Sequence, residues 1–180
     1  MKSITNILAV FTLIILGDNS FAQNGEVFPE ISAENLKNEQ VSLPQDHYGQ
    51  FAVVGVAFSE DAQDDLYTWG PPVHNLFLDK EGLNAMVYDV KVNLLLLFTG
   101  VNKAAYNKAE KMIQEGTEET YRDHNLLYKG EMGDYRNDLA MKDRKVPYIF
   151  VLDKEGKIIY STSGRYTTAK MENITELVEE

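Results

Sequence analysis

The sequence predicts an α/β fold, a three-layer sandwich in which helices flank a central mixed β-sheet that ends in a C-terminal β-hairpin. An apolar segment at residues 51–58 has the composition of a buried strand, and strand-like and helix-like segments alternate after it. Residues 146–160 contain two strand-like runs separated by a tight turn. This order predicts parallel central strands joined by right-handed crossovers, with the hairpin forming an antiparallel edge.

The first strands are expected near the start of the domain. Phe28-Pro29 is followed by spaced apolar residues up to Leu43, a pattern typical of an N-terminal β-hairpin or edge strand. Residues 51–58, with the sequence FAVVGVAF, are rich in β-branched and aromatic side chains. They are expected to form a central buried strand.

A helix is expected directly after that strand. Ser59 or Asp61 can cap its N-terminus, and acidic side chains there favour the positive end of the helix dipole. These acidic side chains are Glu60, Asp61, Asp64 and Asp65. Because a helix interior does not accommodate two prolines, the helix should run toward Trp69 and end at Gly70-Pro71-Pro72.

The middle of the chain predicts a strand, a helix and a long polar connection. Residues 86–92 alternate apolar and polar side chains like a strand, whereas residues 94–98 fit either the end of a strand or a buried loop. Residues 102–114 place apolar side chains near one face at helical spacing, with Gly116 as the expected end. Residues 117–140 are polar, so a loop is expected there, followed by a short helix over residues 135–141.

The C-terminal part carries the clearest local pattern. Residues 146–152 predict a strand, Asp153-Lys154-Glu155-Gly156 a tight turn in which glycine supplies a positive φ, and residues 157–160 the antiparallel partner. A closing helix is expected from near Thr168. Its apolar stripe consists of Met171, Ile174, Leu177 and Val178.

The N-terminus has the organisation of a signal peptide. Lys2 precedes an apolar run at residues 7–16, and Ser20-Phe21-Ala22 forms a small-residue cleavage site. The apolar run is shorter than the roughly twenty residues that span a bilayer. We therefore expect residues 1–22 to be removed and residues 23–180 to form one exported domain, periplasmic or extracellular, without a stable membrane anchor. A retained anchor is the alternative.

Composition limits the chemistry and the partners. The sequence contains no cysteine, so this chain has no thiol nucleophile, thiol relay or thiolate metal site. Its net charge is -11, from 28 acidic and 17 basic residues, and such a surface repels nucleic-acid phosphates and anionic lipid headgroups. No nucleic-acid partner and no cofactor is predicted.

The element order, with a proline at the entrance to the first strand of the hairpin, resembles the thioredoxin superfamily. The resemblance implies that Val146-Pro147 forms a cis peptide bond facing the active site. It also implies that residues 58–64 occupy the position of the redox-active cysteines. Here that segment is Phe58-Ser59-Glu60-Asp61-Ala62-Gln63-Asp64, which holds no sulfur.

Within that superfamily, the chain is most similar to the assembly-factor family of the mitochondrial ATP synthase. The similarity rests on short motifs spread over most of the domain. These are Phe28-Pro29, residues 51–58, Trp69 with Pro71, Tyr148 to Asp153, Gly156-Lys157-Ile158, and Tyr160 followed by Ser163-Gly164. The resemblance implies an assembly role.

Three other chemistries were weighed. The helix-start carboxylates could bind calcium, but their spacing does not match a calcium-binding loop. His47, His74 and His124 are too far apart in sequence to form a zinc motif, and they are expected on the surface or in loops. Ser59 lacks the glycine-flanked turn of a serine nucleophile, so a capping role is expected. No catalytic, metal-binding or cofactor-binding residue is predicted.

A protein or peptide partner is predicted instead. The candidate partner-binding residues are Ser59, Trp69, Pro71, Val146 and Pro147. Trp69 and Tyr67, an aromatic pair beside the rigid turn at Pro71-Pro72, could form a shallow apolar surface, although core packing is the alternative role of Trp69. The backbone of Val146 could hydrogen-bond to an extended polypeptide.

Basic residues around the proline loop and the hairpin could attract an acidic peptide or an anion, and their alternative is a solvated loop. They are Arg136, Lys142, Arg144, Lys145 and Arg165. The predicted function is a non-catalytic binding protein of the cell envelope. An enzyme that uses carboxylates or a metal, and a redox protein that acts through the cysteines of a partner, remain alternatives.

Overall fold

The computed structural model describes residues 24–79, 81–82, 84, 87–131, 133 and 135–179, so the predicted signal peptide, residues 1–22, lies outside the described residues. Within these ranges, seven strands form a single sheet in the order β2-β1-β5-β4-β3-β6-β7. Strands β3, β4 and β5 are parallel, and the other pairs are antiparallel. The strands are β1 (Ile31–Asn35), β2 (Gln40–Leu43), β3 (Phe51–Ala57), β4 (Val90–Thr99), β5 (Asn125–Gly130), β6 (Tyr148–Leu152) and β7 (Ile158–Ser163).

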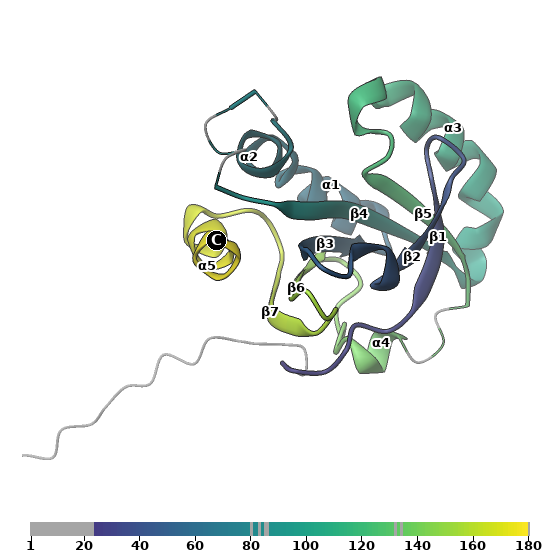
Figure 1. The fold of residues 1–180 in the computed structure, drawn as a ribbon. Helices are drawn as coiled ribbons and strands as arrows, with labels where there is room; N and C mark the ends of the chain where they lie inside the picture. The colour runs from purple at the N-terminus through teal and green to yellow at the C-terminus, as the bar shows by residue number, and fades with distance from the viewer. Residues whose placement is uncertain are drawn as a thin grey trace, which may run out of the picture.

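Helices cover both faces of the sheet, which confirms the predicted fold class. In Figure 1, α1, α2 and α3 lie on one side of the strands and α4 on the other. The helices are η1 (Gln45–His47), α1 (Glu60–Tyr67), α2 (Gly70–Val73), the π-helix η2 (His74–Leu78), η4 (Gly100–Ala105), α3 (Tyr106–Gly116), η5 (Glu119–Tyr121), α4 (Tyr135–Asp138) and α5 (Thr168–Val178). None of the described helices has the length and apolar character that crossing a membrane requires.

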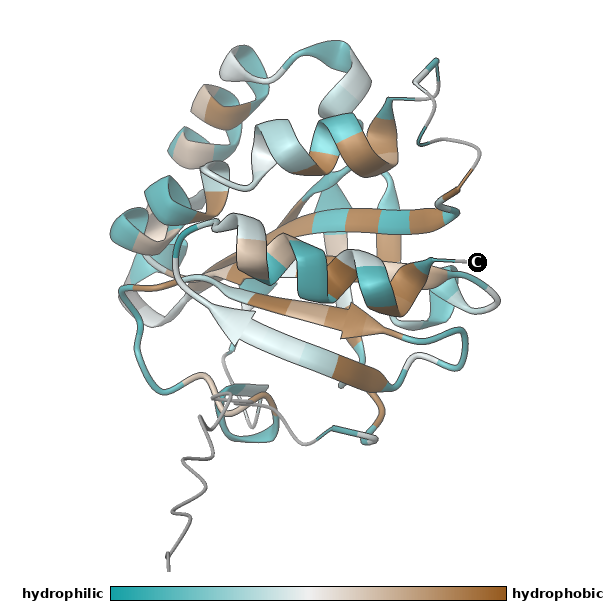
Figure 2. Cartoon of the chain, turned by 90° about the vertical axis from the view of Figure 1, so that its left-hand side faces the viewer, coloured by the Kyte–Doolittle hydropathy of each residue, from teal (hydrophilic) through white to brown (hydrophobic). Residues whose placement is uncertain are grey.

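Two apolar layers hold the helices to the sheet. The layer facing α1, α2 and α5 contains Leu66, Trp69 and Ile174, and the opposite layer contains Phe28 and Phe150. Figure 2 shows the consequence: β6 is brown along most of its length, whereas the neighbouring α5 alternates between brown and teal. A strand buried on both faces is apolar throughout, whereas a surface helix is apolar only along one stripe.

Both predicted hairpins are confirmed. Strand β1 pairs antiparallel with β2, with Ile31 opposite Leu43, and β6 pairs with β7, with Tyr148 opposite Ser163. Gly156 in the second turn has φ +78°, the left-handed conformation that glycine adopts without strain. The closing helix begins at Thr168 as predicted, capped by the Thr167 side chain.

The bounds predicted for the second central strand were wrong. Strand β4 covers Val90–Thr99, so it shares only residues 90–92 with the predicted segment 86–92, and the ambiguous residues 94–98 form half of it. Parallel central strands are buried on both faces and therefore read as continuous apolar runs. The alternation around residues 86–92 was the misleading signal.

The predicted loop at residues 117–140 was also wrong in part. It contains β5 (Asn125–Gly130), which pairs with β4 on one side and with β1 on the other. Only two of its side chains, Leu126 and Leu127, are apolar and fully buried. This segment is a strand because it pairs with two strands that are distant in sequence. Local composition does not reveal such pairing.

The proline pair at residues 71–72 does not end the preceding helix. Helix α1 begins after Ser59 as predicted but ends at Tyr67, and Pro71 and Pro72 lie in the first turn of α2. Proline is favoured at this position because the first N–H groups of a helix have no partner within the helix. The chain therefore stays helical from Gly70 to Leu78.

The expected cis bond at Val146-Pro147 is not found. Among the described residues the cis peptide bond is Leu43-Pro44. The cis and trans forms of an X-Pro bond differ by only about 0.5–1 kcal/mol, so the surrounding structure decides between them. At Pro147, the carbonyl oxygen accepts a hydrogen bond from Gly164 N–H at 2.8 Å, which joins the two arms of the hairpin.

Candidate partner-binding site

Ser59 lies where β3 turns into α1. Its Oγ accepts a hydrogen bond from Ala62 N–H at 3.1 Å and donates one to the carbonyl oxygen of Arg144 at 2.6 Å. The hydroxyl thus caps the helix and also ties the helix start to the loop that precedes β6. Both interactions are structural, and they occupy the side chain at the position where the resemblance would place a reactive thiol.

The loop of residues 143–147 packs onto the same point. Phe58 and Tyr148 stack with ring centroids 6.4 Å apart, and the Arg144 guanidinium carbon lies 5.5 Å from the Phe58 ring. The Tyr148 hydroxyl accepts a hydrogen bond from Asp143 N–H at 2.8 Å. The loop is therefore held against the start of α1. Ser59 and the loop that contains Val146 and Pro147 therefore meet at one corner of the molecule.

Trp69 belongs to the core. Its side chain is 1% exposed, its indole N–H donates to the Gly164 carbonyl oxygen at 3.0 Å, and its ring packs edge-on against Tyr166. Of the two roles weighed for Trp69, the structure shows core packing. The residue connects the end of α1 to the loop before α5 and offers no surface to a partner.

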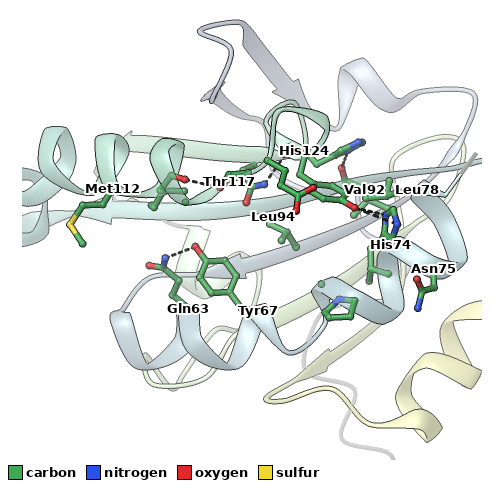
Figure 3. Close-up of a pocket in the computed structure, with 18 residues that line it drawn as sticks. Gln63, Tyr67, His74, Asn75, Leu78, Val92, Leu94, Met112, Thr117 and His124 are labelled. Atoms are coloured by element: carbon green, nitrogen blue, oxygen red, sulfur yellow. Dashed lines mark hydrogen bonds between the residues drawn. The ribbon is translucent and has the colours of Figure 1, made fainter.

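Pro71 lies away from Ser59, on an apolar cavity of about 720 Å³ between helices (Figure 3). One wall comes from α1, α2 and η2, and the other comes from α3 and the segment that follows it. The floor is formed by β4 and by residues next to the start of β5. The lining residues are Gln63, Tyr67, Gly70, Pro71, Val73, His74, Asn75, Leu78, Val92, Leu94, Met112, Ile113, Gly116, Thr117, Glu118, Tyr121, His124 and Asn125.

A second cavity, of about 460 Å³, continues along the same helices. It shares Gln63, Met112 and Ile113 with the first cavity and reaches Phe58 and Ser59 at its other end. The two cavities therefore adjoin, and we call them together the interhelix groove. Ser59 and Pro71, which are far apart on α1 and α2, lie toward opposite ends of it.

The ATP10 protein family profile matches residues 20–180. The chain belongs to the ATP10 protein family. A search of curated proteins gave no match. The predicted similarity to an ATP synthase assembly-factor family is thereby confirmed.

Solved structures similar to this ATP10 family member have a thioredoxin-like fold. The thioredoxin domain of a thiol-disulfide oxidoreductase from Bacteroides vulgatus has a TM-score of 0.52 and 18% identity, covering 87% of this chain and 98% of that one. An exposed lipoprotein thioredoxin from Streptococcus pneumoniae has a TM-score of 0.58 and 11% identity, covering 83% and 99%. BsSco, a member of the Sco family of cytochrome c oxidase assembly proteins, has a TM-score of 0.56 and 10% identity, covering 87% and 94%.

At these identities the likeness concerns the fold. All three similar proteins are described by thiol or disulfide chemistry, whereas this ATP10 family member contains no cysteine. The carboxyl end of β3 is a structural corner in this chain, which supplies no thiol to it.

The wall of the interhelix groove formed by residues 59–78 is acidic. This stretch contains four carboxylates and no lysine or arginine. Of the four, Asp65 forms an ion pair with Arg165 at 3.0 Å, whereas Glu60 and Asp64 line the groove. The Arg165 guanidinium predicted to attract anions is thus engaged by a carboxylate. Arg136, Lys142, Arg144 and Lys145 are exposed.

The surroundings of Tyr67, which lines the groove, shift the pKa of its phenol. Burial raises the pKa of the Tyr67 phenol, the hydrogen bond that Gln63 donates to its oxygen at 2.6 Å lowers it, and the charge of Asp64 raises it further. The net effect is a raised pKa. The phenol therefore stays neutral and presents its ring to the groove.

One histidine does not lie where it was predicted. His47 is buried and hydrogen-bonds to Asn93, whereas His74 in η2 and His124 in the turn before β5 are partly exposed and line the groove. The Tyr121 hydroxyl lies 3.0 Å from His74 Nδ1, and His124 Nδ1 lies 3.0 Å from the Val92 carbonyl oxygen. Within the described part of the chain, no three or more His, Asp or Glu side chains are grouped to hold a metal ion.

Sequence reasoning missed most of the groove. Met112 and Ile113 were assigned to the apolar stripe of a helix, but Met112 is 62% exposed. The signal in the sequence was the width of the apolar stripe on this helix, which exceeds the part of the helix that contacts the sheet. Whether such side chains face a core or an open groove depends on the spacing between two helices.

Proposed function

We propose that this ATP10 family protein is a non-catalytic binding protein of the cell envelope that assists the assembly of another protein. The observation that carries the proposal is the use of Ser59. Its hydroxyl caps α1 and bonds to the Arg144 carbonyl oxygen, so the position matched to a reactive thiol is committed to structure. Family membership and the fold shared with a cytochrome c oxidase assembly protein support an assembly role.

The partner is an extended polypeptide that lies against the loop of residues 143–147. Exposed basic side chains, Lys142, Arg144 and Lys145, line this loop next to half-buried Val146. Rigid anchoring of the loop through Ser59 and Tyr148 lowers the entropy lost when a partner binds. Trp69 is buried and takes no part in this contact.

Export to the envelope follows from the predicted cleavage after Ala22. Fractionation of cells that express the full chain with a C-terminal tag tests this location. The tagged protein should appear in the envelope fraction, and its N-terminus should begin at Gln23. Recovery of the uncleaved chain from the cytoplasm would contradict the proposed location.

Photo-crosslinking tests the partner contact. A photoreactive amino acid replaces Lys145 in the loop or, as the matched control, Glu172 on α5, and both positions are exposed. Crosslinks to one defined protein at position 145 and none at position 172 support the proposal. Equal crosslinking at both positions, or none at 145, would contradict it. Disulfide reductase turnover by the purified protein would contradict the non-catalytic assignment.

A further inference from the structure

The interhelix groove is a second surface on which no described part of the chain is seated. Its floor consists of apolar side chains such as Val92, Leu94 and Leu96, and its walls are helices. Tyr67 on one wall is 41% exposed and Met112 on the other is 62% exposed, so two large apolar side chains reach solvent beside one depression. Figure 3 shows Tyr67 and Met112 on separate helices, with Leu94 to the right of both in this view. Exposed apolar side chains gathered along a depression mark binding sites.

Strand pairing cannot hold an extended peptide in the groove, because of how the surrounding backbone is already bonded. Strand β4 in the floor is paired on both sides, with β3 and with β5. Residues in the walls belong to helices, whose interior backbone groups bond within the helix. An occupant therefore finds no strand edge and must satisfy its own backbone hydrogen bonds, which a helix does.

The size of the groove suits a short helix. Helix α3, which forms one wall, has 11 residues. At about 1.5 Å per residue it is roughly 16 Å long, which is the length of a three-turn helix laid alongside it. Methionine at the rim adapts to different apolar side chains, as Met-rich peptide-binding grooves do.

The charge of the groove determines which charged side chains are favoured beside the apolar stripe of the occupant. The charged residues that line the two cavities are Glu60, Asp64, Glu118 and Lys108, three acids and one base. The wall from residue 59 to residue 78 carries no lysine or arginine. A helix with lysine or arginine beside its apolar stripe complements this wall, whereas an acidic helix is repelled.

We propose that the interhelix groove binds a cationic amphipathic helix of a partner protein. The proposal rests on the non-catalytic binding role proposed above and adds a second site, whose lining residues do not include the loop of residues 143–147. The apolar stripe of the helix packs on Val92, Leu94 and Ile113, between Tyr67 and Met112. Its basic residues face Glu60 and Asp64.

A model peptide tests the groove directly. The probe is a fluorescein-labelled peptide of leucine and lysine, about 15 residues long, with leucines spaced along one helical face. Its counterpart replaces every lysine with glutamate, and a third peptide alternates leucine and lysine in the pattern of a strand. Fluorescence anisotropy with the purified domain should show saturable binding of the helical lysine peptide, roughly micromolar. Circular dichroism should show a gain in helix on binding.

Variants locate the site. Met112→Glu and Tyr67→Glu should each weaken binding of the lysine peptide by about tenfold, and Leu177→Glu on α5 should leave it unchanged. Leu177 is a matched control because it is a 39% exposed apolar side chain on another helix and lines neither cavity. Glu60→Gln combined with Asp64→Asn should weaken the lysine peptide and reduce the salt dependence of its binding.

Several outcomes would overturn the proposal. They are equal affinity for the lysine and glutamate peptides, tighter binding of the strand-patterned peptide, or an effect of Leu177→Glu as large as that of Met112→Glu. Binding of the neutral dye N-phenyl-1-naphthylamine that Met112→Glu abolishes but the helical peptide cannot displace would assign the groove to a small apolar ligand. Crosslinking at position 145 does not involve the groove, so failure of the peptide test leaves the proposed function separately testable.

Discussion

The hydroxyl of Ser59 gives a structural role to the corner of this thioredoxin-like fold where β3 turns into α1. It receives the Ala62 N–H and donates to the Arg144 carbonyl oxygen, so both of its hydrogen-bonding capacities serve the fold. The carboxylates that follow, Glu60 and Asp61, lie in the first turn of α1, where the helix dipole favours negative charge. A helix dipole can activate a thiol at such a position. In this chain, the dipole of α1 instead favours the carboxylates that stabilise the start of the helix.

Removal of this hydroxyl should destabilise the protein without any catalytic consequence. Ser59→Ala deletes the cap and leaves the Arg144 carbonyl oxygen without its donor, so the free energy of unfolding should fall by about 1–2 kcal/mol. Ser59→Asp restores a cap but cannot donate to Arg144, so it should recover part of the loss. Urea denaturation of the three proteins measures both effects. Equal stability of wild type and Ser59→Ala would contradict the assigned role.

Tyr67 provides a residue-scale prediction of pH dependence. Its phenol has a raised pKa in the folded protein, chiefly because burial disfavours the phenolate. The folded state therefore keeps a proton that the unfolded chain releases near pH 10, so the contribution of Tyr67 to stability is constant below that pH and is lost as the pH rises through the folded pKa. A difference titration of tyrosine absorbance between wild type and Tyr67→Phe measures the shift.

A variant of the neighbouring glutamine checks the cause. The Gln63 amide donates to the phenol oxygen at 2.6 Å and favours the phenolate, so Gln63→Ala should raise the pKa of Tyr67 further. A Tyr67 pKa at or below the ordinary tyrosine value in the wild type would show that the ring is not desolvated as the structure has it.

At the scale of elements, the contact between β3 and α1 positions the corner that we propose binds a partner. Gly55 in β3 lies beneath α1, and a Cβ placed there would lie 2.6 Å from Leu66 Cδ1 and 3.1 Å from Leu94 Cδ2. Leu66 is fully buried, so it has little room to move. Close approach of helix and strand therefore depends on the missing side chain of Gly55.

Two glycine substitutions should separate this packing requirement from a general effect of alanine. Gly55→Ala should lower the free energy of unfolding by about 1–3 kcal/mol because it overpacks the core. Gly70→Ala at the start of α2 meets no atom within 4 Å, so it should be neutral or slightly stabilising. Thermal denaturation compares the two. A larger loss for Gly70→Ala than for Gly55→Ala would contradict the packing of α1 on β3.

Element-scale prediction from sequence succeeded where the signal is local. The C-terminal hairpin follows from a turn with glycine at its end, and α1 follows from a capping serine with acidic residues behind it. It failed for β5, whose identity depends on pairing with β4 and β1. It also failed for Pro71-Pro72, because a proline pair can begin a helix as well as end one.

At the scale of the whole molecule, different numbers of residue pairs join the neighbouring strands of the sheet. Strands β3 and β6 pair over five residues each, whereas the N-terminal hairpin joins the rest of the sheet through two residue pairs, Glu34 with Leu127 and Asn35 with Leu126. An attachment this short predicts that the hairpin opens at lower free energy than the centre of the sheet. The parallel core and the C-terminal hairpin form the more stable unit.

Hydrogen exchange tests this distribution of stability. Backbone amides in β1 and β2 should exchange faster than those in β3 and β6 under native conditions. Asn35→Ala should widen the difference, because the Asn35 side chain accepts hydrogen bonds from Lys37 N–H and Glu39 N–H in the hairpin turn, both at 2.9 Å. Uniform protection across β1, β3 and β6 would show that the sheet opens as one cooperative unit.

The residues of the candidate site also differ in whether local sequence patterns predict them. Ser59, Val146 and Pro147 could be named from sequence, because a strand that turns into a helix and a proline that precedes a hairpin are local patterns. Trp69 could not be assigned with certainty, since an indole beside a proline turn suits either a surface or a core. The interhelix groove was not predictable, because its walls come from segments more than thirty residues apart.

The sequence alone determined the absence of thiol chemistry in this chain, the acidic charge, the α/β class and the two hairpins. These properties depend on composition or on neighbours a few residues apart, where side-chain pattern and turn chemistry act directly. Only the tertiary structure decided the extent of β4, the existence of β5, the burial of Trp69 and the groove between α1 and α3. Each of these depends on which distant segments pack together, and burial is a property of that packing.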